Sequence, residues 1–162
     1  MTDANDGVLR QQLAALLRGG QAHATFADAV ANFPVERAGE KPSQLPYSAW
    51  QILEHIRIVL RDLLDFVNDS EYVAQDWPVA YWPKQPAPPN ADAWQQSVQA
   101  IHEDLKKFEE LVTKEESNLY SAVPWGKHGE TLLREVLLAA DHTSYHVGEL
   151  IVLRRLMGAW KS

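Results

Sequence analysis

Residues 131–158, TLLREVLLAADHTSYHVGELIVLRRLMG, decide how the chain folds, because their apolar residues recur with the period of about 3.6 residues that marks an α-helix. An advance of about 100° per residue places His142, His146 and Glu149 in one stripe. An apolar stripe lies on the opposite side of this helix and consists of Leu133, Val136, Leu137, Ala140, Val147 and Ile151. We therefore expect the helix, which spans about residues 131–157, to be covered on two sides, with both histidines facing the interior.

Three earlier segments show the same helical period, and no segment shows the alternation that is typical of strands. They span about residues 6–33, 48–67 and 91–113. A glycine pair at residues 19–20 is expected to bend the first of them. A long, proline-rich irregular link separates the second segment from the third. Four long helices with one long crossover predict an all-α four-helix bundle that forms a single domain over residues 1–162.

The chain is acidic and contains no cysteine. Its 15 basic and 22 acidic residues give a formal charge of -7, which repels nucleic-acid phosphates and anionic membrane surfaces. We therefore expect neither nucleic acid nor a membrane as a partner. Without thiolates, any metal ion must be bound by nitrogen and oxygen atoms. The lack of cysteine also fits a reducing cytoplasm, where we expect the protein to be located.

Three histidines of the predicted helices combine an inward orientation with a spacing that suits a metal ion. His55 lies at the edge of the apolar face of the second helix. His142 and His146 are one turn apart, which places their rings about 6 Å apart on one face, within reach of one divalent ion at about 2.0–2.1 Å from each nitrogen. A lone inward histidine is more often a hydrogen-bonded core residue, and an i, i+4 pair also occurs in ordinary amphipathic helices. The residues alone leave both interpretations open.

The segments WQILEHIRIVLRDLLDF (residues 50–66) and TLLREVLLAADHTSYHVGELIVLRRLMG carry a family resemblance. Together with the P-W-G-x-x-G turn at residues 124–129, they make the chain resemble the DinB-like superfamily of bacterial metal-binding four-helix bundles. In that family one histidine of the second helix and an HxxxH pair of the fourth bind a divalent metal. The resemblance implies that His55, His142 and His146 are the metal ligands here.

The resemblance also implies several functions. Some relatives are thiol-dependent transferases or isomerases in which the metal activates bacillithiol, mycothiol or glutathione, and the absence of cysteine here is compatible with an external thiol. Three imidazoles suit zinc, nickel, iron or manganese, so the ligand set does not select the metal. One alternative is a non-catalytic, stress-associated protein with a structural ion. Another is a metal-dependent hydrolase that uses bound water and needs a base.

Further residues are candidates for the surroundings of the metal. Glu149, one turn beyond His146, orients an imidazole, acts as a base, or is simply a charge at the mouth of the bundle. Asp62 lies seven residues after His55, about 10 Å along the helix, which is too far to ligate and suits a pocket wall or a salt bridge. The other candidates for lining the pocket are His23, Tyr145, Trp82 and Trp125. His23 could instead be exposed to solvent. The two tryptophans could instead cover the ends of the bundle.

The apolar stripe opposite the histidines predicts a contact with a further helix or a second subunit. If the histidine stripe faces the interior, the opposite stripe must be covered by something else. An exposed apolar strip of several turns would be an association surface, and two-fold pairing is its commonest closed solution. We therefore expect a homodimer, in line with the dimers that are common in the family. The alternative is that the first helix, bent at its glycine pair, covers the strip.

Overall fold

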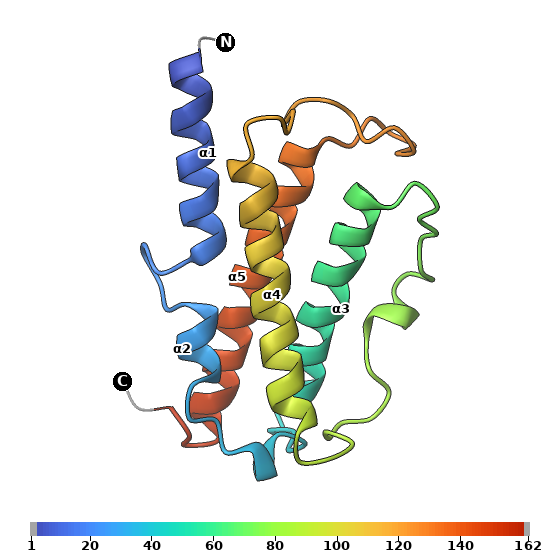
Figure 1. Ribbon diagram of the computed structural model, residues 1–162. Helices are drawn as coiled ribbons and strands as arrows, with labels where there is room; N and C mark the ends of the chain where they lie inside the picture. The colour runs from blue at the N-terminus through green and yellow to red at the C-terminus, as the bar shows by residue number, and fades with distance from the viewer. Residues whose placement is uncertain (1–2, 161–162) are drawn as a thin grey trace.

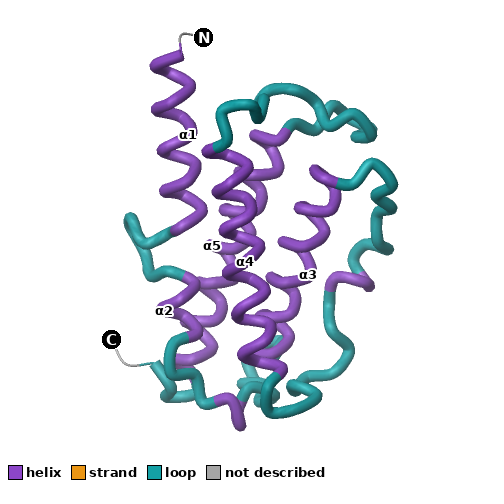
Figure 2. Tube along the Cα trace, in the orientation of Figure 1, coloured by secondary structure: helices purple, strands orange, loops and turns teal. Residues whose placement is uncertain are grey.

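The computed structural model of the protein describes residues 3–160, and its long elements are all α-helices (Figures 1 and 2). The four long helices are α1 (Asp3–Arg18), α3 (Ala49–Asn68), α4 (Ala93–Thr113) and α5 (Leu132–Leu156). The short elements are the helix α2 (Phe26–Val30) and two 3-10 turns, η1 (Val35–Arg37) and η2 (Val79–Tyr81). Within the described part of the chain the only β interaction is an isolated bridge between Ala122 and Thr131. The predicted all-α bundle is confirmed.

Side-chain caps fix where the two histidine-bearing helices begin. The Ser48 hydroxyl accepts a hydrogen bond from the Gln51 amide at 3.2 Å, and the Gln51 side chain accepts one from the Ser48 amide at the same distance. This capping box satisfies two amides that the first turn of α3 leaves without partners. At the start of α5, Thr131 accepts a hydrogen bond from the Arg134 amide at 3.2 Å. The caps set the register in which the histidines follow.

The first predicted helix is interrupted rather than bent. The chain leaves α1 at Arg18, and Gly19 and Gly20 adopt positive φ angles of 70° and 79°. This left-handed backbone costs glycine little because it has no Cβ, and it ends the helix. A new helix, α2, begins after Thr25, whose side chain and backbone form a second capping box with Asp28. The expected continuous element over residues 6–33 was therefore wrong.

The core lies where α3 packs against both α4 and α5, while α1 and α2 cover the opposite sides of α4 and α5. Its largest fully buried apolar side chains come from α3, α4, α5 and the loop that precedes α5, and they are Leu53, Ile56, Leu60, Ile101, Phe108, Leu119, Leu150 and Leu153. Helix α5 is thus enclosed on two sides, as its two stripes predict. One side meets α3 and the other meets α1 and α2.

The apolar strip of α5 is largely covered within the same chain. Ala140 and Val147 are 2% and 3% exposed, on a helix that both α1 and α2 contact. Leu137 remains 44% exposed at the edge of the strip. The intrachain alternative accounts for this strip, so the strip no longer supports the homodimer, which stays a prediction.

The long crossover between α3 and α4 runs back along α3 and carries η2, which contacts that helix (Figure 1). It occupies residues 69–92 and places Tyr81 and Trp82 beside α3. Among the described residues no helix combines the length and the apolar character that are needed to cross a membrane.

Candidate metal centre

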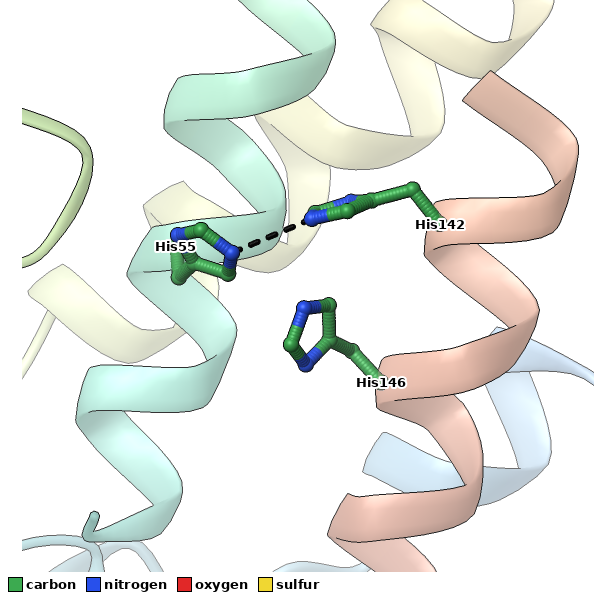
Figure 3. A group of neighbouring side chains, drawn as sticks. All are labelled: His55, His142 and His146. Carbon is green, nitrogen blue, oxygen red and sulfur yellow. Dashed lines mark hydrogen bonds between the residues drawn. The ribbon is translucent and has the colours of Figure 1, made fainter. Parts of the chain in front are cut away.

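Three histidine side chains converge in the space between α3 and α5 (Figure 3). His55 comes from α3, and His142 and His146 come from successive turns of α5. Each ring offers one nitrogen atom, and these three atoms lie within 4.8 Å of one another. No carboxylate of residues 3–160 joins the cluster at that distance. The donor set therefore consists of three imidazoles from two helices.

The spacing of the ring nitrogens fits one divalent ion. The Nε2 atoms of His55 and His142 are 3.0 Å apart. Two nitrogens that bind one ion at about 2.0–2.1 Å, with angles of about 90–109° at the ion, are separated by about 2.9–3.4 Å. The observed separation lies within this range, so His55 and His142 need little movement to bind the same ion.

Contacts from the crossover determine the orientation of His55. Its Nδ1 atom lies 2.7 Å from the backbone carbonyl of Tyr81, which can only accept a hydrogen bond. The proton of the neutral ring must therefore be on Nδ1, and Nε2 presents its lone pair to the cluster. Trp82 stacks on the ring face with centroids 3.9 Å apart and an angle of 4°, and Tyr47 stacks on Trp82 at 3.8 Å. His55 is held at its edge and at its face.

Glu149 orients the second ring. One of its carboxylate oxygens lies 2.6 Å from Nδ1 of His146, so the proton of this neutral ring is also on Nδ1 and its Nε2 atom is free to bind a metal. Burial raises the pKa of Glu149, although the Coulomb attraction of His55 opposes this. Of the roles predicted for Glu149, the structure places it in the orienting contact.

His142 is the ring that no second contact orients. Its Nδ1 atom is buried and has no hydrogen-bond partner among residues 3–160, whereas its Nε2 atom lies against Nε2 of His55. Because the latter carries a lone pair, the hydrogen bond between the two rings requires the proton on Nε2 of His142. A buried polar atom without a partner costs about 1–3 kcal/mol. The metal-free cluster therefore leaves one ring nitrogen unsatisfied.

All three rings are in the neutral form that metal ligation requires. Burial lowers the pKa of His142 to about 3, and the neighbouring rings of His146 and His55 lower it further. Burial, aided by His55, lowers the pKa of His146 to about 4. The pKa of His55 is also lowered by burial. At neutral pH no proton has to leave the cluster as a whole before a cation binds.

Three further predicted residues lie beside the histidines. Trp82 covers His55, and the Tyr145 ring lies edge-on to His146 with centroids 4.9 Å apart. Tyr145 and Glu149 also line a groove of about 290 Å³. Its remaining wall is mostly apolar and comprises Leu45, Pro46, Tyr47, Ile52, Gly148 and Val152. The groove therefore adjoins the cluster through Glu149.

Three other predicted residues lie away from the cluster. His23 is exposed and lines a separate cavity of about 260 Å³, which borders α5 at Thr143 and Ser144 rather than at the histidine stripe. Trp125 donates its indole N–H to the Phe66 carbonyl at 2.6 Å, at the far end of α3. Within the described part of the chain, Asp62 belongs neither to the wall of the groove nor to a salt bridge. Its carboxylate accepts hydrogen bonds from the hydroxyls of Tyr81 and Tyr72.

Sequence reasoning named Trp82 but missed two other residues that hold His55, Tyr81 and Tyr47. Tyr81 acts through its backbone carbonyl, and a carbonyl gives no sequence signal because every residue has one. Tyr47 lies in an irregular segment in front of α3 and reaches the cluster only through Trp82. Its place in the stack depends on the path of two loops, which no periodicity encodes.

One family model matches the chain, that of the DinB superfamily, over residues 19–150. The match covers most of the chain and includes His55, His142, His146 and Glu149. No curated protein and no solved structure matches the chain. The arrangement of the helices and the extent of this match establish that the chain belongs to the DinB superfamily.

Proposed function

We propose that the protein is a metal-dependent enzyme that uses an external low-molecular-weight thiol, either to transfer it to an electrophile or to isomerise a substrate. His55, His142 and His146 would hold the ion, which is zinc, nickel, iron or manganese. The observation that carries the proposal is a set of three protein ligands that lies next to a groove. Three imidazoles leave at least one coordination position for another molecule.

The chemistry of the proposal requires a Lewis acid at the cluster. A divalent ion bound there lowers the pKa of a thiol or water molecule in its open position and so produces a nucleophile near neutral pH. The chain has no cysteine, so the sulfur has to come from outside. Bacillithiol, mycothiol and glutathione are the thiols to test.

The surrounding residues have separate tasks in this proposal. Glu149 holds the His146 ring, and the stack of Trp82 and Tyr47 covers His55 and keeps water from that face. The apolar wall of the groove, which includes Ile52 and Val152, would bind the apolar part of an electrophile. Tyr145, which lies edge-on to His146 and lines the groove, would contact a substrate bound there.

Metal content and thiol transfer test the proposal in turn. After dialysis, elemental analysis should find about one equivalent of metal in the wild type and almost none in a His142→Ala, His146→Ala variant. His128→Ala, which removes an exposed histidine of a loop, is the matched control and should keep the metal. The loaded protein is then mixed with each of the three thiols and an activated aryl halide, and conjugate formation is followed. Full metal content without conjugation of any thiol would reject the transferase.

A second candidate is a metal-dependent hydrolase with Glu149 as the base. The observation that favours this candidate is the position of Glu149, which lines the groove and lies beside His146. Hydrolysis of activated esters that Glu149→Gln abolishes even at a saturating metal concentration would favour it. A structural ion is disfavoured because the described residues offer no fourth protein ligand at the cluster.

A further inference from the structure

We propose that Tyr81 is a positioning residue of the metal centre: its hydroxyl group, bound by Asp62, holds in place the backbone carbonyl that orients His55. This inference rests on the metal binding proposed above and is independent of the reaction. It assigns a task to a residue of the crossover loop and to a buried carboxylate that the proposed chemistry does not use.

The two ends of Tyr81 contact two different turns of α3. Its carbonyl oxygen lies 2.7 Å from Nδ1 of His55, and its hydroxyl group donates a hydrogen bond to Asp62 at 2.7 Å. The two helix residues are seven positions apart, which corresponds to about 10 Å along the axis. Tyr81 is 7% exposed and Asp62 is 8% exposed, so water does not compete freely for these contacts. A single loop residue is therefore fixed at both ends to the helix that carries the ligand.

The carbonyl needs this support because it belongs to an irregular segment. Tyr81 ends the short 3-10 turn η2, and its amide donates only a turn hydrogen bond to Pro78 at 3.2 Å. A carbonyl in a helix or sheet is held by a repeating ladder of bonds, but this one is not. The hydrogen bond to Asp62 instead fixes the far end of the Tyr81 side chain, and so limits the movement of the Tyr81 backbone. Trp82, the next residue, stacks on His55, so movement of this segment would disturb both contacts of the ring.

Asp62 ties the crossover to α3 at a second place as well. Its other carboxylate oxygen accepts a hydrogen bond from the Tyr72 hydroxyl at 3.0 Å. Tyr72 contacts the same carboxylate, but no contact of Tyr72 with His55 is present among the described residues. Tyr72→Phe therefore serves as the control: it removes a hydrogen bond to the same carboxylate and a contact with the Tyr81 hydroxyl, but it leaves the bond between Tyr81 and Asp62 in place.

Loss of the fixed carbonyl would change the tautomer of His55. With an acceptor at Nδ1, the neutral ring keeps its proton there and leaves Nε2 free for the cation. Without it, the proton is shared between both nitrogens, and part of the population must move a proton before binding. Partners of this kind contribute about 10–100-fold to metal affinity. The Tyr81 hydroxyl does not contact the ring itself and acts through the Tyr81 carbonyl. We therefore expect its removal to weaken metal binding by a factor near the lower end of this range.

The test compares Tyr81→Phe with Tyr72→Phe in the full chain. Zinc affinity is measured by competition with a chromophoric chelator, and the tautomer of His55 is measured in the metal-free protein by ¹⁵N NMR of the imidazole rings. We expect Tyr81→Phe to weaken zinc binding about tenfold and to convert His55 from the Nδ1-protonated form to a mixture. Tyr72→Phe should leave the tautomer unchanged and weaken zinc binding clearly less. Equal affinities for the two variants, or an unchanged tautomer in Tyr81→Phe, would overturn the inference.

The two readouts separate this inference from the proposed function. A wild type that binds no zinc, nickel, iron or manganese rejects the metal centre, whereas the tautomer measurement still decides whether Tyr81 orients His55. If Tyr81→Phe does not fold, Asp62→Leu replaces it, because leucine has about the shape of the aspartate side chain and cannot accept the hydrogen bond from Tyr81. The same shift in the tautomer is expected in that variant, and its absence would contradict the role of the Asp62 bond.

Discussion

Acid should destabilise the metal-free protein through His142 and His146. Burial lowers their pKa values to about 3 and about 4 in the folded protein, against about 6.5 in an unfolded chain. Below pH 6.5 these two histidines are therefore protonated in the unfolded state while they remain neutral in the folded state. The free energy of unfolding must fall as the pH falls from about 6.5 towards the folded pKa values of about 4 and 3.

The size of the effect at pH 5 depends on the unfolded state alone. At that pH both rings are still largely neutral in the folded protein, so the exact folded pKa values matter little. Each histidine of the unfolded chain is about 1.5 pH units below its pKa, which corresponds to about 2 kcal/mol at about 1.36 kcal/mol per unit. The two rings together should lower the free energy of unfolding by about 4 kcal/mol between pH 7.5 and pH 5.

Urea unfolding in the presence of a chelator measures this loss at both pH values. Other groups also titrate; burial raises the pKa values of Glu135 and Asp104, which acts in the opposite direction. The comparison therefore uses a His142→Leu, His146→Leu variant, in which these groups remain. The change in unfolding free energy with pH should be smaller in the variant by about 4 kcal/mol. The reasoning fails if the wild type and the variant show the same dependence on pH.

Bound zinc should stay in place at pH 6.5, where an ordinary histidine is half protonated, because burial lowers the pKa values of all three ligands; release at pH 6.5, followed with a chelator dye, would contradict this. Phe108→Ala should lower the free energy of unfolding in urea by about 3–5 kcal/mol, since Phe108 is fully buried; a loss below 1 kcal/mol would show that the core closes around the gap. Glu149→Gln should weaken zinc binding about tenfold by exchanging a charged acceptor for a neutral one, and a chelator competition that gives wild-type affinity would refute this. The homodimer predicts a light-scattering mass of twice 18.3 kDa that is reduced by Leu137→Glu, and a mass of 18.3 kDa would refute it.

The sequence predicts most strongly the features that depend only on helical periodicity. The positions of His142 and His146 on one face of α5 require only their spacing, and the inward orientation of His55 requires only the apolar face of α3. The family resemblance, rather than the periodicity, predicted that the three rings converge. The geometry of the cluster agrees with that prediction. The start of α3 at Ala49 is set by the Ser48 cap, which can be read from four residues.

Features that depend on the path of loops could not be predicted. The position of His23 was tied to a first helix that runs on to residue 33, and the break at Gly19 moved it to a different cavity. Trp125 binds a helix-end carbonyl that any nearby indole could reach. The salt bridge or pocket wall expected for Asp62 was based on its charge, whereas its actual partners are tyrosines from a distant part of the crossover.

The hydrogen bonds of Tyr72 and Tyr81 to one carboxylate divide the crossover into parts with different tolerance to changes in length. Residues 73–80 begin and end near Asp62, so they form a closed loop, and Val73, Trp77 and Val79 within it are strongly exposed. Extra residues inserted at its tip would extend into solvent without moving either end. An insertion between Tyr81 and Trp82 would instead separate the two contacts of His55. Foreign peptides or labels can therefore be placed within residues 73–76 without altering the histidine cluster.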